Sequence, residues 1–282
     1  MNGIHITALL TSVLAAIGMG TLIHRLRQPA DGRLLLLAVL VMLPLQPLVF
    51  HLVRMPLDQW LVGHLGRASV SYQWLTSLYA PLTEEPSKLV VLLIPAILRD
   101  IRPENFVRYA LAIGLGFAIG EMWFVADRIS LRPALAALPF HQFGGYVVER
   151  LMTCVFHAAF VALALSQLRR RFLLGFAGAV AAHWLANFPI LLMNWNVGGL
   201  GQATWGLLVS LWLSVLLIGA MALLAYFILG RASPGRLIFG RRHCPGCSAD
   251  YDAPLIAVNF GITRYERCPH CRGWHWTKAC DA

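Results

Sequence analysis

The sequence predicts an all-α polytopic membrane protein with about seven transmembrane helices, followed by a small C-terminal β module. Of the 282 residues, 58% are hydrophobic and only 13% are charged, whereas a soluble domain carries about 25% charge. The mean hydropathy is +0.66, the apolar residues fall in long blocks, and the chain becomes polar past Gly230. These observations exclude a water-soluble globular protein.

Seven segments match the length of a membrane span. A hydrocarbon core of about 30 Å needs about 20 mostly apolar residues in a helix. The segments cover about residues 4–23, 34–53, 70–98, 109–127, 147–168, 172–193 and 204–229. The third is too long for one straight span and contains Pro81 and Pro86, so we expect it to be kinked or divided.

Arginines between the segments predict the orientation. Thirteen of them follow segments one, three, five and seven, and five follow segments two, four and six. The positive-inside rule therefore places the N-terminus outside and the C-terminus in the cytoplasm of a cell (inner) membrane. The net charge of +10 is distributed over these loops, so we expect the lipid bilayer, and not nucleic acid, as a partner.

The tail carries a cysteine pattern typical of a metal site. We divide the chain into a membrane domain (1–230), a linker (231–243) and a tail (244–282). Two C-x-x-C pairs in the tail are separated by twenty residues; the four cysteines are Cys244, Cys247, Cys268 and Cys271. Two such turns can close a tetrahedral shell around structural Zn²⁺. The residues between them, around 255–258 and 264–266, predict a β-hairpin, so the module is similar to a zinc ribbon.

Ionisable residues inside the spans are the candidate site. Such residues are costly in hydrocarbon and usually face one another or a polar cavity. They are Glu84 and Glu85 in the third segment, Glu121 in the fourth, His157 in the fifth, and His183 with Asn187 in the sixth. Counted from the nearest cytoplasmic arginine at about 1.5 Å per residue, Glu84, Glu121, His157 and His183 lie at similar depths of about 18–22 Å. Small residues such as Gly116, Gly120 and Gly178 would let these helices pack closely.

Carboxylates, imidazoles and an amide at one depth favour hydrolysis. A carboxylate can activate water while an imidazole or amide holds the developing oxyanion. Alternatively, Glu121, His157 and His183 could ligate a second, catalytic metal. The residues alone leave both routes open.

The order of these residues resembles a known family. Glu84 to Lys88 fits E-E-x-x-K, Phe117 to Glu121 fits F-x-x-x-E, His157 stands alone, and His183 to Asn187 fits H-x-x-x-N. Over about residues 70–195, this series resembles the PrsW family of intramembrane proteases, which is related to the CAAX prenyl protease and bacteriocin-processing group. The resemblance implies an intramembrane endopeptidase that cleaves a membrane-anchored protein, such as an anti-sigma-type regulator. It also implies Glu84 and Glu85 as the water-activating dyad, completed by Glu121, His157, His183 and Asn187.

Two other functions fit the same features. Intramembrane glutamates and histidines can form the relay of a proton-coupled transporter, although the sequence shows no repeat of the transporter kind. A non-catalytic membrane scaffold would use the cysteine module to recruit a cytoplasmic partner.

Overall fold

A computed structural model describes residues 2–26, 28–229, 240–254, 257–260 and 263–278. Within these ranges, six helical stretches are long and apolar enough to cross a membrane. They are Gly3–Arg25, Gly32–Leu65, Phe106–Ser130, Phe140–Ser166, Phe172–Asn194 and Gln202–Leu229. These stretches match six of the seven expected segments, so the chain is a helical membrane protein.

The remaining expected segment, 70–98, is not a continuous span. It consists of α5 (Val70–Ser77), α6 (Tyr79–Lys88), a 3₁₀ turn η2 (Val90–Leu93) and α7 (Pro95–Asp100). Pro86 lies inside α6 and Pro95 begins α7, and a proline removes a backbone donor from the helical ladder. Six stretches among the described residues are therefore long and apolar enough to span a membrane. The segment 70–98 is divided as expected, but Pro81 and Pro86 both lie inside α6, and the breaks fall at Leu78 and around 89–94.

The other helical elements follow in chain order. Helix α1 is Gly3–Arg25; the second stretch comprises α2 (Gly32–Met42), α3 (Leu45–Val49), a π-helical turn η1 (Phe50–Arg54) and α4 (Met55–Leu65). Then come α8 (Phe106–Ser130), α9 (Pro133–Ala136), η3 (Phe140–Phe143), α10 (Gly144–Ser166), α11 (Phe172–Asn194), η4 (Val197–Gly199) and α12 (Gln202–Leu229).

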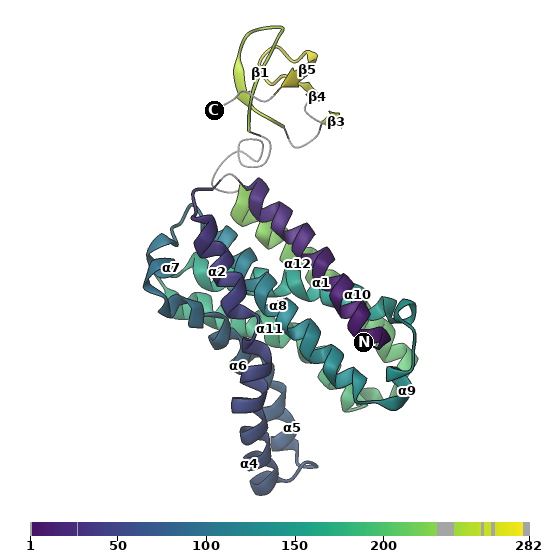
Figure 1. The fold of residues 1–282 in the computed structure, drawn as a ribbon. Helices are drawn as coiled ribbons and strands as arrows, with labels where there is room; N and C mark the ends of the chain where they lie inside the picture. Colours follow the sequence, from purple (N-terminus) through teal and green to yellow (C-terminus); the bar gives the residue numbers. More distant parts are fainter. Residues whose placement is uncertain (1, 27, 230–239, 255–256, 261–262, 279–282) are drawn as a thin grey trace.

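Helix α8 is the centre of the helical domain and packs against α1, α2, α3 and α10 (Figure 1). Two of its glycines permit the close approach of the second stretch. A Cβ atom on Gly116 or Gly120 would collide with the backbone carbonyl of Val39 or Leu43, respectively. By contrast, a Cβ on Gly178 would meet nothing within 4 Å. The expected small-residue contact is therefore present at α8 and absent at Gly178.

The tail forms two small antiparallel sheets, which Figure 1 shows as a separate lobe after α12. Strand β1 (Arg241–His243) pairs with β2 (Asp250–Asp252). Strands β3 (Val258–Phe260), β4 (Thr263–Arg267) and β5 (Trp274–Lys278) form the second sheet in that order. The expected hairpin is β3–β4, although residues 255–256 lie outside the described ranges. Strand β1 lies within 231–243, the positions expected to form the linker.

Candidate functional site

Helix α6 carries three buried ionisable residues. Glu84, Glu85 and Lys88 are 4%, 2% and 0% exposed, respectively. Consecutive residues on a helix point about 100° apart, so the two carboxylates reach different neighbours. The site therefore begins with two glutamates that have separate roles.

Glu85 is enclosed by a cation and an imidazole. The Nζ atom of Lys88 donates to Oε1 of Glu85 at 2.5 Å, and Nδ1 of His183 on α11 lies 2.5 Å from the same oxygen. The ammonium group of Lys88 also stands 5.0 Å from the ring centre of Phe117 and 5.7 Å from that of Phe160. Lys88 is thus a fully buried partner of Glu85.

Glu84 faces in another direction. It forms an ion pair with Arg54, the last residue of the π-helical turn η1, an element type often found at functional sites. The Nε2 atom of His183 lies 3.8 Å from Oε2 of Glu84. His183 therefore stands between the two glutamates, hydrogen-bonded to Glu85 and close to Glu84 without a direct hydrogen bond.

A second carboxylate–imidazole pair links α8 and α10. Nε2 of His157 lies 2.7 Å from Oε2 of Glu121, and an Arg150 guanidinium nitrogen lies 3.1 Å from Oε1. The other ring nitrogen of His157 is buried and has no hydrogen-bond partner among the described residues. The rings of His157 and His183 are 6.1 Å apart, centroid to centroid. The two pairs are therefore neighbours.

A cavity of about 290 Å³ connects these groups. Its lining includes Glu84, Glu121, His157, His183 and Asn187, together with Gln46, Arg54 and Arg150. Glu85 is absent from this lining among the described residues. The structure therefore brings all six candidate residues together, with five on the cavity wall and Glu85 behind it.

Arg54, Arg150 and Gln46 also line the cavity and lie outside the sequence-based candidate set. The sequence-based orientation count treats Arg54 and Arg150 as loop arginines. In the structure, both lie within helical stretches and pair with site carboxylates. A signal exists for Arg150, because it precedes His157 by seven residues and so lies on the same helix face. Gln46 is 3% exposed, and its side-chain oxygen has no hydrogen-bond partner among the described residues. No comparable spacing identifies Arg54 or Gln46.

The four tail cysteines form the second candidate site. Their Sγ atoms all lie within 4.8 Å of one another, with 3.7 Å between Cys244 and Cys271 and 3.8 Å between Cys247 and Cys268. Sulfur atoms about 2.3 Å from one tetrahedral ion lie about 3.8 Å apart, whereas a disulfide needs about 2.05 Å. The cluster therefore fits a metal ion. Cys154 is a buried free thiol on α10.

His275 on β5 supports this cluster and is missing from the sequence-based set. Its Nε2 atom lies 3.5 Å from Sγ of Cys271. A Cβ on Gly246 or Gly273 would come within 2.7 Å of the His275 ring, so both glycines leave space for the imidazole. A ring nitrogen that donates to a ligand sulfur orients that ligand.

The free thiols differ in acidity. Although burial opposes ionisation, backbone N–H groups of Gly246 and Cys247 lower the pKa of Cys244 to about 7. At Cys247, a hydrogen bond from the Ala249 backbone N–H lowers the pKa, whereas partial desolvation and the neighbouring thiols raise it. The net result is that the pKa of Cys247 is raised to about 11. Cys244 therefore ionises more readily than Cys247 and is more ready to accept a metal ion.

Among the described residues, the four cysteines are the one group in which at least three Cys, His, Asp or Glu side chains bring ligand atoms together. Glu121, His157 and His183 are neighbours, but each imidazole faces a carboxylate instead of sharing a common point with two other ligands.

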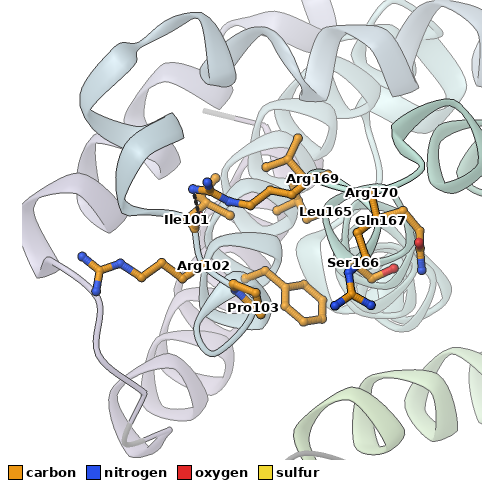
Figure 2. Close-up of a pocket in the computed structure, with 10 residues that line it drawn as sticks. Ile101, Arg102, Pro103, Leu165, Ser166, Gln167, Arg169 and Arg170 are labelled. Atoms are coloured by element: carbon orange, nitrogen blue, oxygen red, sulfur yellow. Dashed lines mark hydrogen bonds between the residues drawn. The ribbon is translucent and has the colours of Figure 1, made fainter.

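A third feature is a basic pocket of about 260 Å³ between the start of α8 and the end of α10. Figure 2 shows Arg102, Arg169 and Arg170 around it, with Arg169 donating to the Ile101 carbonyl oxygen at 3.0 Å. Arg108 donates to the carbonyl of Ile23 near the end of α1. Arginine-bearing loops that are distant in sequence thus meet at one end of the helical domain.

Comparison with known proteins finds no match to this chain among family models, curated proteins or solved structures.

Proposed function

We propose that this protein is an intramembrane endopeptidase that cleaves a membrane-anchored protein substrate. The observation that carries the proposal is the meeting of two carboxylate–imidazole pairs, Glu85–His183 and Glu121–His157, at one cavity inside a helical membrane domain. Ionisable residues are rarely retained at such positions without a functional role.

The first pair supplies the base. In the tautomer that donates Nδ1–H to Glu85, the Nε2 lone pair of His183 points away from Glu85, and Oε2 of Glu84 lies 3.8 Å from it. Two acceptors at this separation can bind the two hydrogens of one water molecule, which leaves an oxygen lone pair for attack. Glu85 orients His183 and stabilises its protonated form, as the carboxylate of a Ser-His-Asp triad does. The water-activating pair is then Glu84 with His183, and Glu85 acts through His183.

The second pair and Asn187 complete the reaction. As His183 takes a proton, the water oxygen bonds to the scissile carbonyl carbon and the π electrons move to the carbonyl oxygen. The Asn187 amide, four residues after His183 on α11, and His157 in the doubly protonated form that Glu121 stabilises then donate hydrogen bonds to that oxyanion. The C–N bond then breaks when the leaving nitrogen takes the proton from His183, which yields a carboxylic acid and an amine.

The substrate class follows from the resemblance to PrsW-type proteases and from the membrane location. We place the N-terminus outside, the tail in the cytoplasm and the protein in the cell membrane, because the arginine-rich loops lie at one end of the helices. A membrane-anchored regulator of the anti-sigma type is the expected substrate.

For the tail, we propose a structural Zn²⁺ held by Cys244, Cys247, Cys268 and Cys271. A module of about 40 residues cannot bury enough apolar surface to fold alone, so the ion would supply much of its stability.

The test compares new N-termini of membrane proteins in cells that express the wild type or one variant. Glu84→Gln, Glu85→Gln and His183→Ala should each remove the same cleavage products, with losses of about 10²–10⁴-fold. Glu104→Gln, a carboxylate change at an exposed position, is the matched control. Products that persist in all three site variants would refute the proposal.

Metal content separates the two chemical routes. Full-length protein should contain one zinc per chain, and Cys244→Ser should contain none, if the membrane site uses carboxylates and imidazoles alone. The catalytic-metal route predicts two metal ions per chain in the wild type. Cys244→Ser would then lose the tail ion and keep one, and His157→Ala would lose the membrane ion and keep one. That result would assign Glu121, His157 and His183 to a catalytic metal.

A scaffold is the second candidate, because every site carboxylate has a cationic partner: Arg54 for Glu84, Lys88 for Glu85 and Arg150 for Glu121. Ion pairs of this kind can be structural. A scaffold requires the tail and not the site, so Cys244→Ser would abolish its function while Glu85→Gln would preserve it.

A further inference from the structure

One face of the β3–β4–β5 sheet is aromatic and basic. Side chains alternate between the two faces of a strand, and residues paired across strands share a face. Val258, Tyr265 and Trp276 are paired across the three strands, and Arg267 is paired with Trp274. These residues therefore lie on one face of the sheet, and Lys278 lies at the end of that face. No acidic residue is present on this face among the described positions.

The opposite face is the interior of the tail. Glu266 is 0% exposed and accepts hydrogen bonds from Tyr251 at 2.9 Å and from Thr277 at 2.7 Å. His275, from the same face of β5, lies against Cys271. The aromatic face is thus directed away from the cysteine cluster.

The aromatic residues form a continuous platform. Tyr265 is stacked on Trp274 with 5.4 Å between ring centroids, and it contacts Trp276 at 5.2 Å. Trp274 and Trp276 are 52% and 54% exposed, and Val258 is 54% exposed. Large apolar side chains gathered on a surface indicate a binding site.

The platform has a cationic border. Arg267 and Lys278 flank it on β4 and β5, and Arg267 donates to the carbonyl oxygen of Arg272, which is itself exposed. Tryptophan and tyrosine beside basic residues are the composition that favours the interface between water and an anionic membrane.

We propose that this face, defined by Val258, Tyr265, Arg267, Trp274, Trp276 and Lys278, docks onto the anionic surface of the bilayer in which the helices lie. Chain connectivity supports this occupant over others. Ten residues lie between Leu229, the end of α12, and Gly240, and the eleven Cα-to-Cα steps span at most about 40 Å. The bilayer surface is therefore always within reach at high effective concentration.

This docking does not depend on peptidase activity. It gives the tail a fixed position beside the membrane, with its cysteine cluster directed towards the cytoplasm. Because each basic residue near an anionic surface strengthens binding about fivefold, the attachment is reversible and sensitive to salt.

The test uses full-length protein in phosphatidylcholine nanodiscs with or without phosphatidylglycerol. A donor dye on an added C-terminal peptide reports energy transfer to a rhodamine head-group lipid. Transfer should be high only with phosphatidylglycerol, and it should fall at high salt as charges are screened. Replacing both Arg267 and Lys278 by glutamine should lower the docked-to-free ratio about 25-fold.

Trp274→Ser with Trp276→Ser should have a comparable effect, and Trp60→Ser, an exposed tryptophan on α4, should have none. Unchanged zinc content shows that the tail of each variant is still folded. Transfer that is insensitive to phosphatidylglycerol and to both double variants would overturn the proposal. So would a single-stranded oligonucleotide that binds in phosphatidylcholine discs through Trp274 and Trp276, because the face would then be a base-stacking platform.

Discussion

His157 and His183 stand 6.1 Å apart in the helical domain, and carboxylates from two further helices, Glu121 on α8 and Glu85 on α6, hold their rings. Four helices thus contribute to a site whose polar groups would be costly if each faced lipid alone. Phe160 stacks on His183 at 5.4 Å, and the Phe117 ring stands edge-on to His157 at 5.0 Å. The imidazoles are held by aromatic packing as well as by hydrogen bonds.

The effects of replacing Lys88 and Glu85 on the stability of the protein should be coupled. Lys88→Met leaves a buried carboxylate without its cation, which typically costs about 3–5 kcal/mol. Adding Glu85→Gln should recover much of that loss, because no charge is then left unpaired. Thermal unfolding of the purified protein in detergent measures both variants, with Glu104→Gln as an exposed control. Equal unfolding temperatures for the single and double variants would contradict the assigned pairing.

Gly120 should be intolerant of a methyl group, unlike Gly178. Gly120→Ala places a Cβ against the carbonyl oxygen of Leu43, so α8 and α2 must separate, at a cost of about 1–3 kcal/mol. Gly178→Ala has open space and should be neutral or stabilising, because alanine favours a helix. The measurement is again thermal unfolding. A larger loss at Gly178 than at Gly120 would show that these helix contacts are wrong.

His275→Ala should weaken zinc binding by about 10–100-fold, the usual effect of removing a residue that orients a metal ligand. His270→Ala, an exposed histidine in the second C-x-x-C pair, should leave the affinity unchanged. Competition with a chromogenic chelator gives both affinities. A larger loss of zinc affinity in His270→Ala than in His275→Ala would instead make His270 the residue that supports the ligands.

Zinc uptake by the tail should release protons and strengthen as the pH rises. The pKa of Cys247 is raised to about 11. The pKa of Cys271 is also raised, because partial desolvation and neighbouring thiols outweigh the hydrogen bond from the Gly273 backbone N–H, which lowers it. Both thiols are therefore protonated near neutral pH, and the metal must displace their protons. Cys244, with a pKa of about 7, contributes less. Calorimetry in two buffers of different ionisation enthalpy counts the protons; heats that are independent of the buffer would contradict the prediction.

Local patterns account for the parts of the architecture that could be predicted. The apolar runs predicted seven spans, and six of them match helical stretches long enough to cross a membrane, because a helix that satisfies its own backbone is stable in lipid wherever the run is long enough. Pro81 and Pro86 predicted that segment 70–98 is divided, although the breaks lie on either side of α6, which contains both prolines. The spacing of Cys244, Cys247, Cys268 and Cys271 predicted their convergence, since each C-x-x-C turn positions two sulfurs locally.

The pairing within the membrane site could not be predicted in the same way. Depth along a helix follows from counting residues, so the common height of Glu84, Glu121, His157 and His183 was predictable from the chain. The neighbours of each side chain depend on how the helices rotate and pack. Arg54 is therefore a partner of Glu84 and not a loop residue, and Lys88 pairs with Glu85.

The amino-acid sequence by itself determined that this chain enters a membrane, where six of its helical stretches lie, and that four cysteines can hold a metal ion, because run length and short spacing are local properties. Only the tertiary structure decided that Glu84 faces the cavity while Glu85 lies behind it, and that three cations neutralise the site. The physical reason is that helix rotation is set by contacts between residues far apart in the chain, such as Gly120 against Leu43.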